Sequence, residues 1–412
     1  MSDPQPSLRR SIGLIPLIIY GVGVTVGAGI YVLVGISAGL AGPLVPLSFL
    51  LAALIVAPSA FTFAELSARL PRSAGEALYV LEAFGSLHLS RVVGLAVVFV
   101  GVVSSATVTN GAAGYIGEIL SLPDWMTKLL FISTLGAIAM WGVLQSVVVT
   151  VALTIIELGG LLLILGFGFW SIGTLDILHW PAWSMPLNGI GAGAIITGVL
   201  SGSLVAFFAF IGFEDLVNMA EEVHEPKIIV PRAITWTLIL TTLLYLGVVI
   251  VAINVVPPAE LAMSGAPLAL VFERASGHRE AAFAGIAVLA TVNTVLVQII
   301  MASRVLYGMV EAGAMPTVFG RVNRRTQTPL IATSFVIAIV LLLAIVFPLA
   351  GLARTTTFIA LSIFTVINLA LWCIKRRDQS TPSHFTVPIW VPAIGAILST
   401  AILVFEIMQL VT

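Results

Sequence analysis

The polar positions of this sequence gather in short clusters between long apolar runs, and this pattern predicts a helical protein that crosses a membrane many times. The first run extends from Ile12 to about Ser37 and contains no charged residue. A membrane-crossing helix needs roughly 20 apolar residues. Eleven such runs can be read along the chain, at about 12–37, 43–66, 92–117, 127–142, 147–171, 190–218, 232–256, 281–309, 329–348, 354–373 and 388–411.

The composition agrees with an all-α polytopic membrane protein. Only 9% of the 412 residues are charged, against about 25% in a typical soluble domain, and the mean hydropathy is +1.14. The first apolar run is too long for a cleavable signal peptide and has no A-x-A-like site. The single Cys373 excludes an internal disulfide and a cysteine metal cluster. A net charge of −1 gives no indication of a nucleic-acid partner.

The basic residues predict the orientation of the chain. With the N-terminus in the cytoplasm, fourteen Lys and Arg residues fall inside and four fall outside, which is the bias expected for short loops. The inside set is Arg9, Arg10, Arg69, Arg72, Arg91, Lys227, Arg232, Arg304, Arg321, Arg324, Arg325, Lys375, Arg376 and Arg377; the outside set is Lys128, Arg274, Arg279 and Arg354. We therefore expect a multi-pass protein of the cell membrane with a cytoplasmic N-terminus. Glu65 lies four residues before Arg69, the spacing of a helical ion pair, and Ser73–Tyr79 predicts a short interfacial helix.

Four glycines interrupt the first apolar run, at Gly21, Gly23, Gly27 and Gly29. Each costs a helix about 1 kcal/mol relative to alanine, and irregular backbone is tolerated at membrane depth only inside protein or beside a cavity. One interpretation is a helix break near Val26–Gly29 that leaves backbone N–H groups free to bind an anion. The other interpretation is close helix packing, which we favour for Gly21 and Gly23.

A second interruption is predicted in the sixth run. Gly212 is flanked there by aromatic residues and followed by Glu214 and Asp215, which does not suit a lipid-facing helix. Broken helices five spans apart are typical of two inverted five-helix repeats with a binding site between them. We expect repeat one at about 12–171 and repeat two at about 190–373. A cytoplasmic tail (1–11) and a cytoplasmic loop with an extra eleventh helix (374–412) would flank this core.

Glu157 lies near the middle of the otherwise apolar fifth run. A charged and isolated carboxyl costs several kcal/mol there, so this side chain should face the interior, pair with another group or be protonated. One interpretation is a protonatable coupling group or a group that senses the substrate. The other is a neutral carboxyl that forms a hydrogen bond with a helix backbone.

Motifs for other functions are absent from the sequence. It contains no P-loop, nucleophile elbow, paired catalytic carboxylates or zinc motif, so we expect neither an enzyme nor a bound cofactor or metal. A channel should show a polar pore stripe or a filter loop, and neither is present.

An ordered set of motifs resembles the amino acid–polyamine–organocation superfamily of transporters, in particular the cationic amino acid transporter branch and its bacterial relatives. The motifs are Val26-Gly27-Ala28-Gly29-Ile30-Tyr31, Phe208-Ala209-Phe210-Ile211-Gly212-Phe213-Glu214, Glu221-Glu222-Val223-His224-Glu225-Pro226, Ala302-Ser303-Arg304, Tyr307-Gly308-Met309 and Thr328-Pro329. The resemblance covers the first ten spans. It implies inverted repeats and transport by alternating access, with an amino acid as the substrate.

The resemblance also implies roles for individual residues. Amides of Gly27, Ala28 and Gly29 would hold the substrate carboxylate, and carbonyls of Phe210 and Ile211 would hold its ammonium group. The predicted substrate-binding set is Val26, Gly27, Ala28, Gly29, Ile30, Ser105, Phe207, Phe208, Phe210, Ile211, Gly212 and Asn293, with Phe208 as the aromatic gate and Phe207 as the alternative. The predicted coupling set is Glu157, Thr291 and Thr294, of which the two threonines would serve sodium.

Two departures from the family pattern affect this prediction. Many sodium-independent members have a Lys where this chain has Glu157, so a coupling mechanism based on lysine cannot be transferred. Many members also have a twelfth helix, for which no apolar run is found here. We expect a secondary active amino acid transporter that is proton-coupled or exchanging. The alternative is a sodium-coupled amino acid or polyamine transporter.

Overall fold

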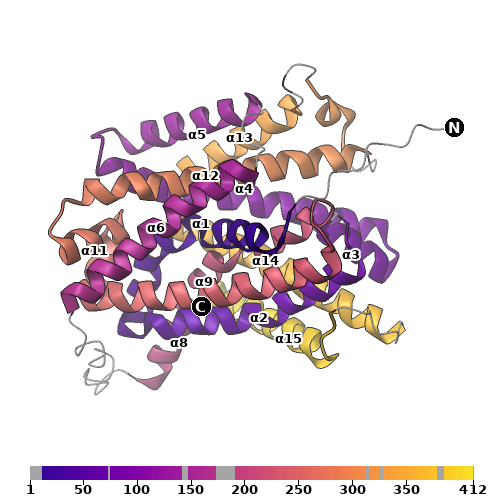
Figure 1. Ribbon diagram of the computed structural model, residues 1–412, viewed down its shortest axis with the longest axis horizontal. Coiled ribbons are helices and arrows are strands. Elements are labelled where there is room, and N and C mark those ends of the chain that lie inside the picture. The colour runs from indigo at the N-terminus through magenta and orange to yellow at the C-terminus, as the bar shows by residue number, and fades with distance from the viewer. Residues whose placement is uncertain are drawn as a thin grey trace.

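A computed structural model describes residues 12–72, 75–141, 147–172, 191–311, 315–323, 326, 328–377 and 385–411, and it is helical through most of them (Figure 1). The long helices are α1 (Leu14–Ala41), α2 (Val45–Arg69), α4 (Leu87–Gly117), α5 (Asp124–Trp141), α6 (Val147–Ile172), α8 (Ala192–Phe210), α9 (Pro226–Val255), α12 (Glu280–Glu311), α13 (Leu330–Val346), α14 (Leu349–Arg377) and α15 (Trp390–Val411). The short helices are η1 (Gly42–Leu44), α3 (Gly75–Phe84), η3 (Phe213–Met219), α10 (Pro258–Met263), α11 (Pro267–Ser276) and η4 (Thr317–Gly320).

The structure confirms a polytopic all-α membrane protein. Among the described residues, eight stretches are long and apolar enough to cross a membrane; the first of them, Leu14–Arg69, contains both α1 and α2, and α13 is a shorter apolar helix. Each of the eleven predicted runs contains a helix. The count of eleven membrane crossings stays a prediction, because α5 is not among these stretches. The short α3 was expected, whereas α10 and α11 were not.

Helices from the two halves of the chain pack against one another in pairs. α1 packs on α8, α2 on α9, α4 on α12 and α5 on α13. In each pair the two helices occupy the same position in the predicted repeats, an arrangement that agrees with a two-fold axis between them. The division into repeats stays a prediction. The buried α1 lies within the bundle, where it also packs on α6 and α9 (Figure 1).

The first described residue, Ile12, is attached to the chain beyond η3. Its N–H donates to the carbonyl of Glu222 at 3.0 Å, and its carbonyl accepts from the N–H of His224 at 2.9 Å. The start of α1 and the segment after α8 are therefore held together by backbone bonds. The predicted tail 1–11, with Arg9 and Arg10, lies outside the described residues, as do Arg324 and Arg325.

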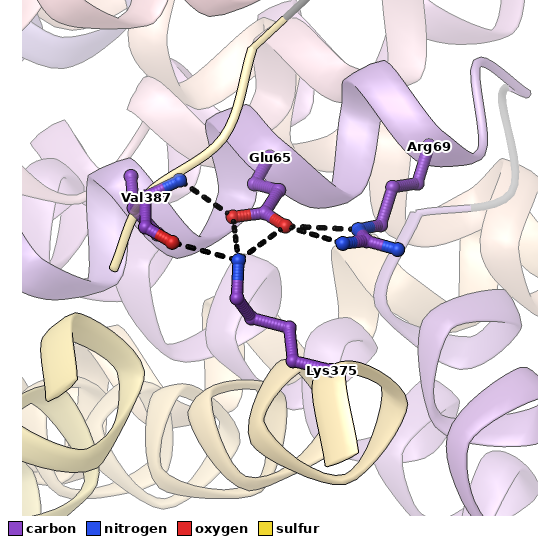
Figure 2. A network of polar contacts seen from close by, with 4 residues as sticks. All are labelled: Glu65, Arg69, Lys375 and Val387. Carbon is purple, nitrogen blue, oxygen red and sulfur yellow. Dashed lines mark hydrogen bonds and ion pairs between the residues drawn. The ribbon is translucent and has the colours of Figure 1, made fainter. Parts of the chain in front are cut away.

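A buried ionic network fixes α2 to α14 and to the segment 385–388 before α15 (Figure 2). Glu65 is fully buried, and its carboxylate accepts from Lys375 Nζ at 2.7 and 2.8 Å. It also accepts from Arg69 Nε at 2.9 Å and from the N–H of Val387 at 2.8 Å. Lys375 completes the network by donating to the Val387 carbonyl at 2.7 Å. The Glu65–Arg69 pair predicted from sequence is thus confirmed, with Lys375 as a further partner.

We expect Lys375→Met to destabilise the folded protein by about 3 kcal/mol, because it leaves a buried carboxylate with only part of its compensation. Arg69→Met should cost less, since Lys375 still pairs with Glu65. The matched control is Lys128→Met, whose partner Asp124 is exposed and whose loss should cost at most about 1 kcal/mol. Thermal unfolding of the purified protein measures the ranking. Equal loss of stability in the Lys375 and Lys128 variants would contradict it.

Candidate functional site

The α1 helix is broken at Gly27, as the sequence predicted. Its backbone has φ 32° and ψ −152°, a conformation that side chains other than glycine rarely adopt. The N–H of the next residue, Ala28, donates to Thr294 Oγ1 of α12 at 2.9 Å. A Cβ at Gly27 would lie 2.7 Å from the same hydroxyl oxygen. The break therefore turns a backbone amide toward α12, where a hydroxyl satisfies it.

The second predicted break is also present, at the end of α8. The helix ends at Phe210, Ile211 is extended, and Gly212 has φ 127° before the chain enters η3. The N–H of Gly212 donates to Glu214 Oε2 at 2.8 Å. Glu214 thus provides a side-chain acceptor for a backbone amide that lies beyond the last turn of the helix.

The two breaks lie against each other. A Cβ added at Gly212 would be 2.8 Å from the carbonyl oxygen of Val24, and one added at Gly29 would be 2.6 Å from Cα of Ala209. These glycines therefore allow the backbones of α1 and α8 to approach more closely than larger residues would permit.

Tyr245 of α9 joins the two breaks. Its hydroxyl lies 2.9 Å from the carbonyl oxygen of Thr25, 3.1 Å from that of Val26 and 2.7 Å from that of Ala209. The side chain is fully buried, and its ring packs on that of Phe210 with centroids 5.1 Å apart. A single hydroxyl hydrogen serves one carbonyl at a time, so Tyr245 satisfies only one of these three carbonyls at any moment.

The predicted aromatic residues surround the α8 break but differ in their contacts. Phe207 packs on Phe364 of α14 with ring centroids 5.8 Å apart. Phe210 packs on Tyr245. Phe208, the predicted gate, is 4% exposed, and its carbonyl accepts from the N–H of Ile211 at 3.1 Å. The gating role of Phe208 stays a prediction.

The predicted hydroxyl residues are used in different ways. Ser105 donates to the carbonyl of Gly101 at 2.8 Å, and Thr291 donates to that of Val288 at 2.7 Å, each within its own helix. Thr294 donates to the Ala290 carbonyl at 3.3 Å and accepts from Ala28 N–H. Of these three, the structure brings only Thr294 into hydrogen-bonding contact with the α1 break.

Glu157 lies beside α1 in the interior. The hydroxyl of Tyr31 donates to its backbone carbonyl at 2.6 Å, which holds α6 against α1 just after the break. The side chain is fully buried, and within the described residues neither carboxyl oxygen has a hydrogen-bond partner of good geometry, although Asn293 of α12 is adjacent. The predicted Glu157 and Asn293 are thus neighbours.

A small cavity adjoins the α8 break. It has a volume of about 30 Å³, and its lining includes Ile211, Glu214 and Asp215, together with Glu76 of α3 and Gln298 of α12. Burial raises the pKa of the Glu76 carboxyl from 4.5 to about 7.

The sequence reasoning missed two of these residues. Tyr245 gave a usable signal, because it is a lone tyrosine within the long apolar stretch Pro226–Val255, where a hydroxyl needs a partner. Glu76 gave none, because an acidic residue in a predicted interfacial helix is ordinarily exposed to water.

We expect Tyr245→Phe to lower stability by about 1–3 kcal/mol, because buried carbonyls at both breaks lose a donor. Amide hydrogen exchange should accelerate in peptides covering residues 24–29 and 209–213. Tyr79→Phe is the matched control, since the buried Tyr79 hydroxyl has no partner among the described residues. Unchanged exchange at both breaks in Tyr245→Phe would show that the hydroxyl does not hold them.

We expect Glu76→Gln to stabilise the protein at pH 8 and to have little effect at pH 5. The unfolded carboxyl ionises near pH 4.5 and the folded one near pH 7, so wild-type stability falls as the pH rises between these values. The titratable groups facing Glu76 are Glu214 and Asp215 of η3 and Tyr79 of its own helix. Thermal midpoints at both pH values test this, with the exposed Glu82→Gln as control. A gain that is equal at the two pH values would contradict it.

Comparison with known proteins identifies the family. The sequence model of the amino acid permease family matches residues 12–411. The branched-chain amino acid permease BcaP of Bacillus subtilis is 28% identical over 93% of this chain and 85% of its own length. The vacuolar cationic amino acid transporter 2 of Arabidopsis thaliana is 28% identical over 91% of this chain, which spans 62% of that longer protein. The methylthioribose transporter of Bacillus subtilis is 26% identical over 95% of this chain and 86% of its own. The resemblance found in the sequence is thereby confirmed, and the chain belongs to the amino acid permease family.

Proposed function

We propose that this protein is a secondary active amino acid transporter that works by alternating access in the cell membrane, with its N-terminus in the cytoplasm. The observation that carries the proposal is the pair of adjacent helix breaks in α1 and α8, bridged by Tyr245. Discontinuous helices at a repeat interface are the usual place for substrates in transporters built from inverted repeats. The relatives are named as permeases and transporters, which supports transport without an enzymatic reaction.

The substrate binds between the two breaks. Its carboxylate takes the place of Thr294 Oγ1 at the amide of Ala28, with the amides of Gly27 and Gly29 as further donors. The ammonium group binds the carbonyl oxygens of Phe210 and Ile211 at the end of α8. The carbonyls around Tyr245 supply further acceptors. The relatives are named for branched-chain amino acids, cationic amino acids and methylthioribose, so we assign the substrate class as an amino acid without choosing its side chain.

Transport of the amino acid is coupled to protons or proceeds by exchange, and we assign Glu157 as the coupling group. Within the described residues its two buried carboxyl oxygens have no hydrogen-bond partner of good geometry and no counter-charge, although Asn293 is adjacent, which favours a group that gains and loses a proton over a permanent ion. Sodium coupling through Thr291 and Thr294 is the alternative, but both hydroxyls already form hydrogen bonds with the backbone. The same alternative includes a polyamine as substrate.

Uptake into proteoliposomes tests the function. Purified protein should take up a labelled amino acid saturably and should show counterflow when the vesicles are preloaded with the unlabelled compound. The substrate is first found by screening amino acids for thermal stabilisation, since a ligand that binds the folded state raises its apparent stability. No saturable uptake of any stabilising amino acid would contradict the proposal.

We expect Glu157→Gln to preserve exchange but to abolish accumulation driven by a pH gradient, because the amide cannot carry a proton. Glu82→Gln, which removes a charge from an exposed position, should leave both activities unchanged. Weaker affinity for cationic substrates alone would instead assign Glu157 an electrostatic role. Uptake that fails when sodium is replaced by choline would establish the sodium alternative.

A further inference from the structure

The cavity beside the α8 break is enclosed by parts of the chain that are far apart in sequence. Glu76 comes from α3, Glu214 and Asp215 from η3, and Gln298 from α12, while apolar walls include Val100 of α4 and Phe364 of α14. Its volume of about 30 Å³ accommodates one or two groups of the size of water. It lies beside the proposed substrate site, with which it shares Ile211, but no residue of α1 is among those that line it.

Two carboxyl groups of this cavity lack compensation. The exposed fractions of Glu76 and Asp215 are 6% and 9%. Within the described residues, the carboxyl of Asp215 has no hydrogen-bonding or ionic partner, and that of Glu76 is met only by its own backbone N–H. No basic side chain is among the residues that line the cavity. Glu65 shows the contrast, because two cations and a backbone amide satisfy it.

Burying an acidic group without a counter-charge costs free energy, and no contact among the described residues offsets this cost for Glu76 or Asp215. A cation in the cavity would remove that cost. We propose that this cavity binds the protonated primary amino group of a small organic cation, as a site distinct from the paired breaks. The proposal goes beyond amino acid transport, because it assigns a second ligand position whose occupancy does not require turnover.

The lining favours an amine over a metal ion. Among the described residues, no group of three His, Cys, Asp or Glu side chains is arranged to hold a metal. Hard cations take six or more oxygen ligands, waters included, and a cavity of about 30 Å³ is too small to hold such a cation with several waters. An ammonium group has three N–H donors, and Glu76, Asp215 and Gln298 offer carboxylate and amide oxygens to accept them. The apolar walls suit an alkyl substituent, and the Phe364 ring suits a neighbouring cation.

Equilibrium dialysis with labelled methylammonium tests the proposal on purified wild-type protein at pH 8, where Glu76 is mostly ionised. We expect saturable binding that unlabelled methylammonium displaces. Tetramethylammonium carries the same charge without an N–H donor and should displace the label poorly, as should sodium. Asp215→Asn and Glu76→Gln should each raise the half-saturating concentration about tenfold or more, because each removes a charged hydrogen-bond acceptor. Glu82→Gln removes the same charge from the exposed side of α3 and should leave binding unchanged.

Each variant should elute from size-exclusion chromatography as a single folded species before its binding is compared with that of the wild type. Dialysis is done well below the unfolding temperature, so that small losses of stability do not change the amount of folded protein. Equal displacement by sodium and methylammonium would overturn the proposal in favour of non-specific ion binding. Binding of unchanged affinity in the Asp215→Asn and Glu76→Gln variants would overturn it by placing the amine elsewhere. Failure of amino acid uptake with intact methylammonium binding would refute the proposed function alone, and the reverse result would refute the cavity site alone.

Discussion

The bundle depends on how backbone polar groups are satisfied where two helices break inside an apolar protein. An unpaired amide or carbonyl at membrane depth costs several kcal/mol, so a break persists only if other groups replace the missing helical bonds. Tyr245 serves carbonyls of both breaks, Thr294 serves the amide of Ala28, and Glu214 serves the amide of Gly212. These side chains come from three elements, and the position of each break therefore depends on the packing of the whole core.

The breaks can bind a substrate because its polar groups can replace the side chains that satisfy the backbone there. A carboxylate oxygen can replace a hydroxyl that accepts from an amide, and an ammonium group can replace the tyrosine hydroxyl as the donor to these carbonyls. The zwitterion of an amino acid carries both groups. Binding then requires only the replacement of one set of hydrogen bonds by another, rather than the creation of a new polar surface in the membrane.

Buried carboxylates in this protein divide into two kinds. Glu65 is matched by Lys375, Arg69 and a backbone amide (Figure 2), and such a compensated charge fixes the relative positions of helices. Glu157 and Asp215 are buried without comparable partners among the described residues. Uncompensated ionisable groups within a membrane protein are expensive, and they are expected where a ligand or a proton supplies the missing partner.

The sequence predicted those features that follow from local chemistry. The apolar runs predicted the helices, and Gly27 and Gly212 predicted the breaks because helix-disrupting residues at membrane depth require a special environment. It did not predict the partners of the breaks. The contact between Tyr245 and the carbonyl of Thr25 joins residues 220 positions apart, and the approach of Glu76 to Asp215 depends on how α3 folds back on η3. The short α10 and α11 were missed because, at 6 and 10 residues, they are far shorter than the roughly 20-residue apolar runs on which the sequence analysis relied.

The most direct test of the account is a structure of the protein with its amino acid bound at saturating concentration. The account predicts a substrate carboxylate within hydrogen-bonding distance of the amides of Ala28 and Gly29, with Thr294 Oγ1 displaced from Ala28, and the ammonium group at the carbonyls that end α8. An amino acid bound elsewhere, with the Ala28–Thr294 hydrogen bond intact, would contradict the central claim that the paired helix breaks form the substrate site.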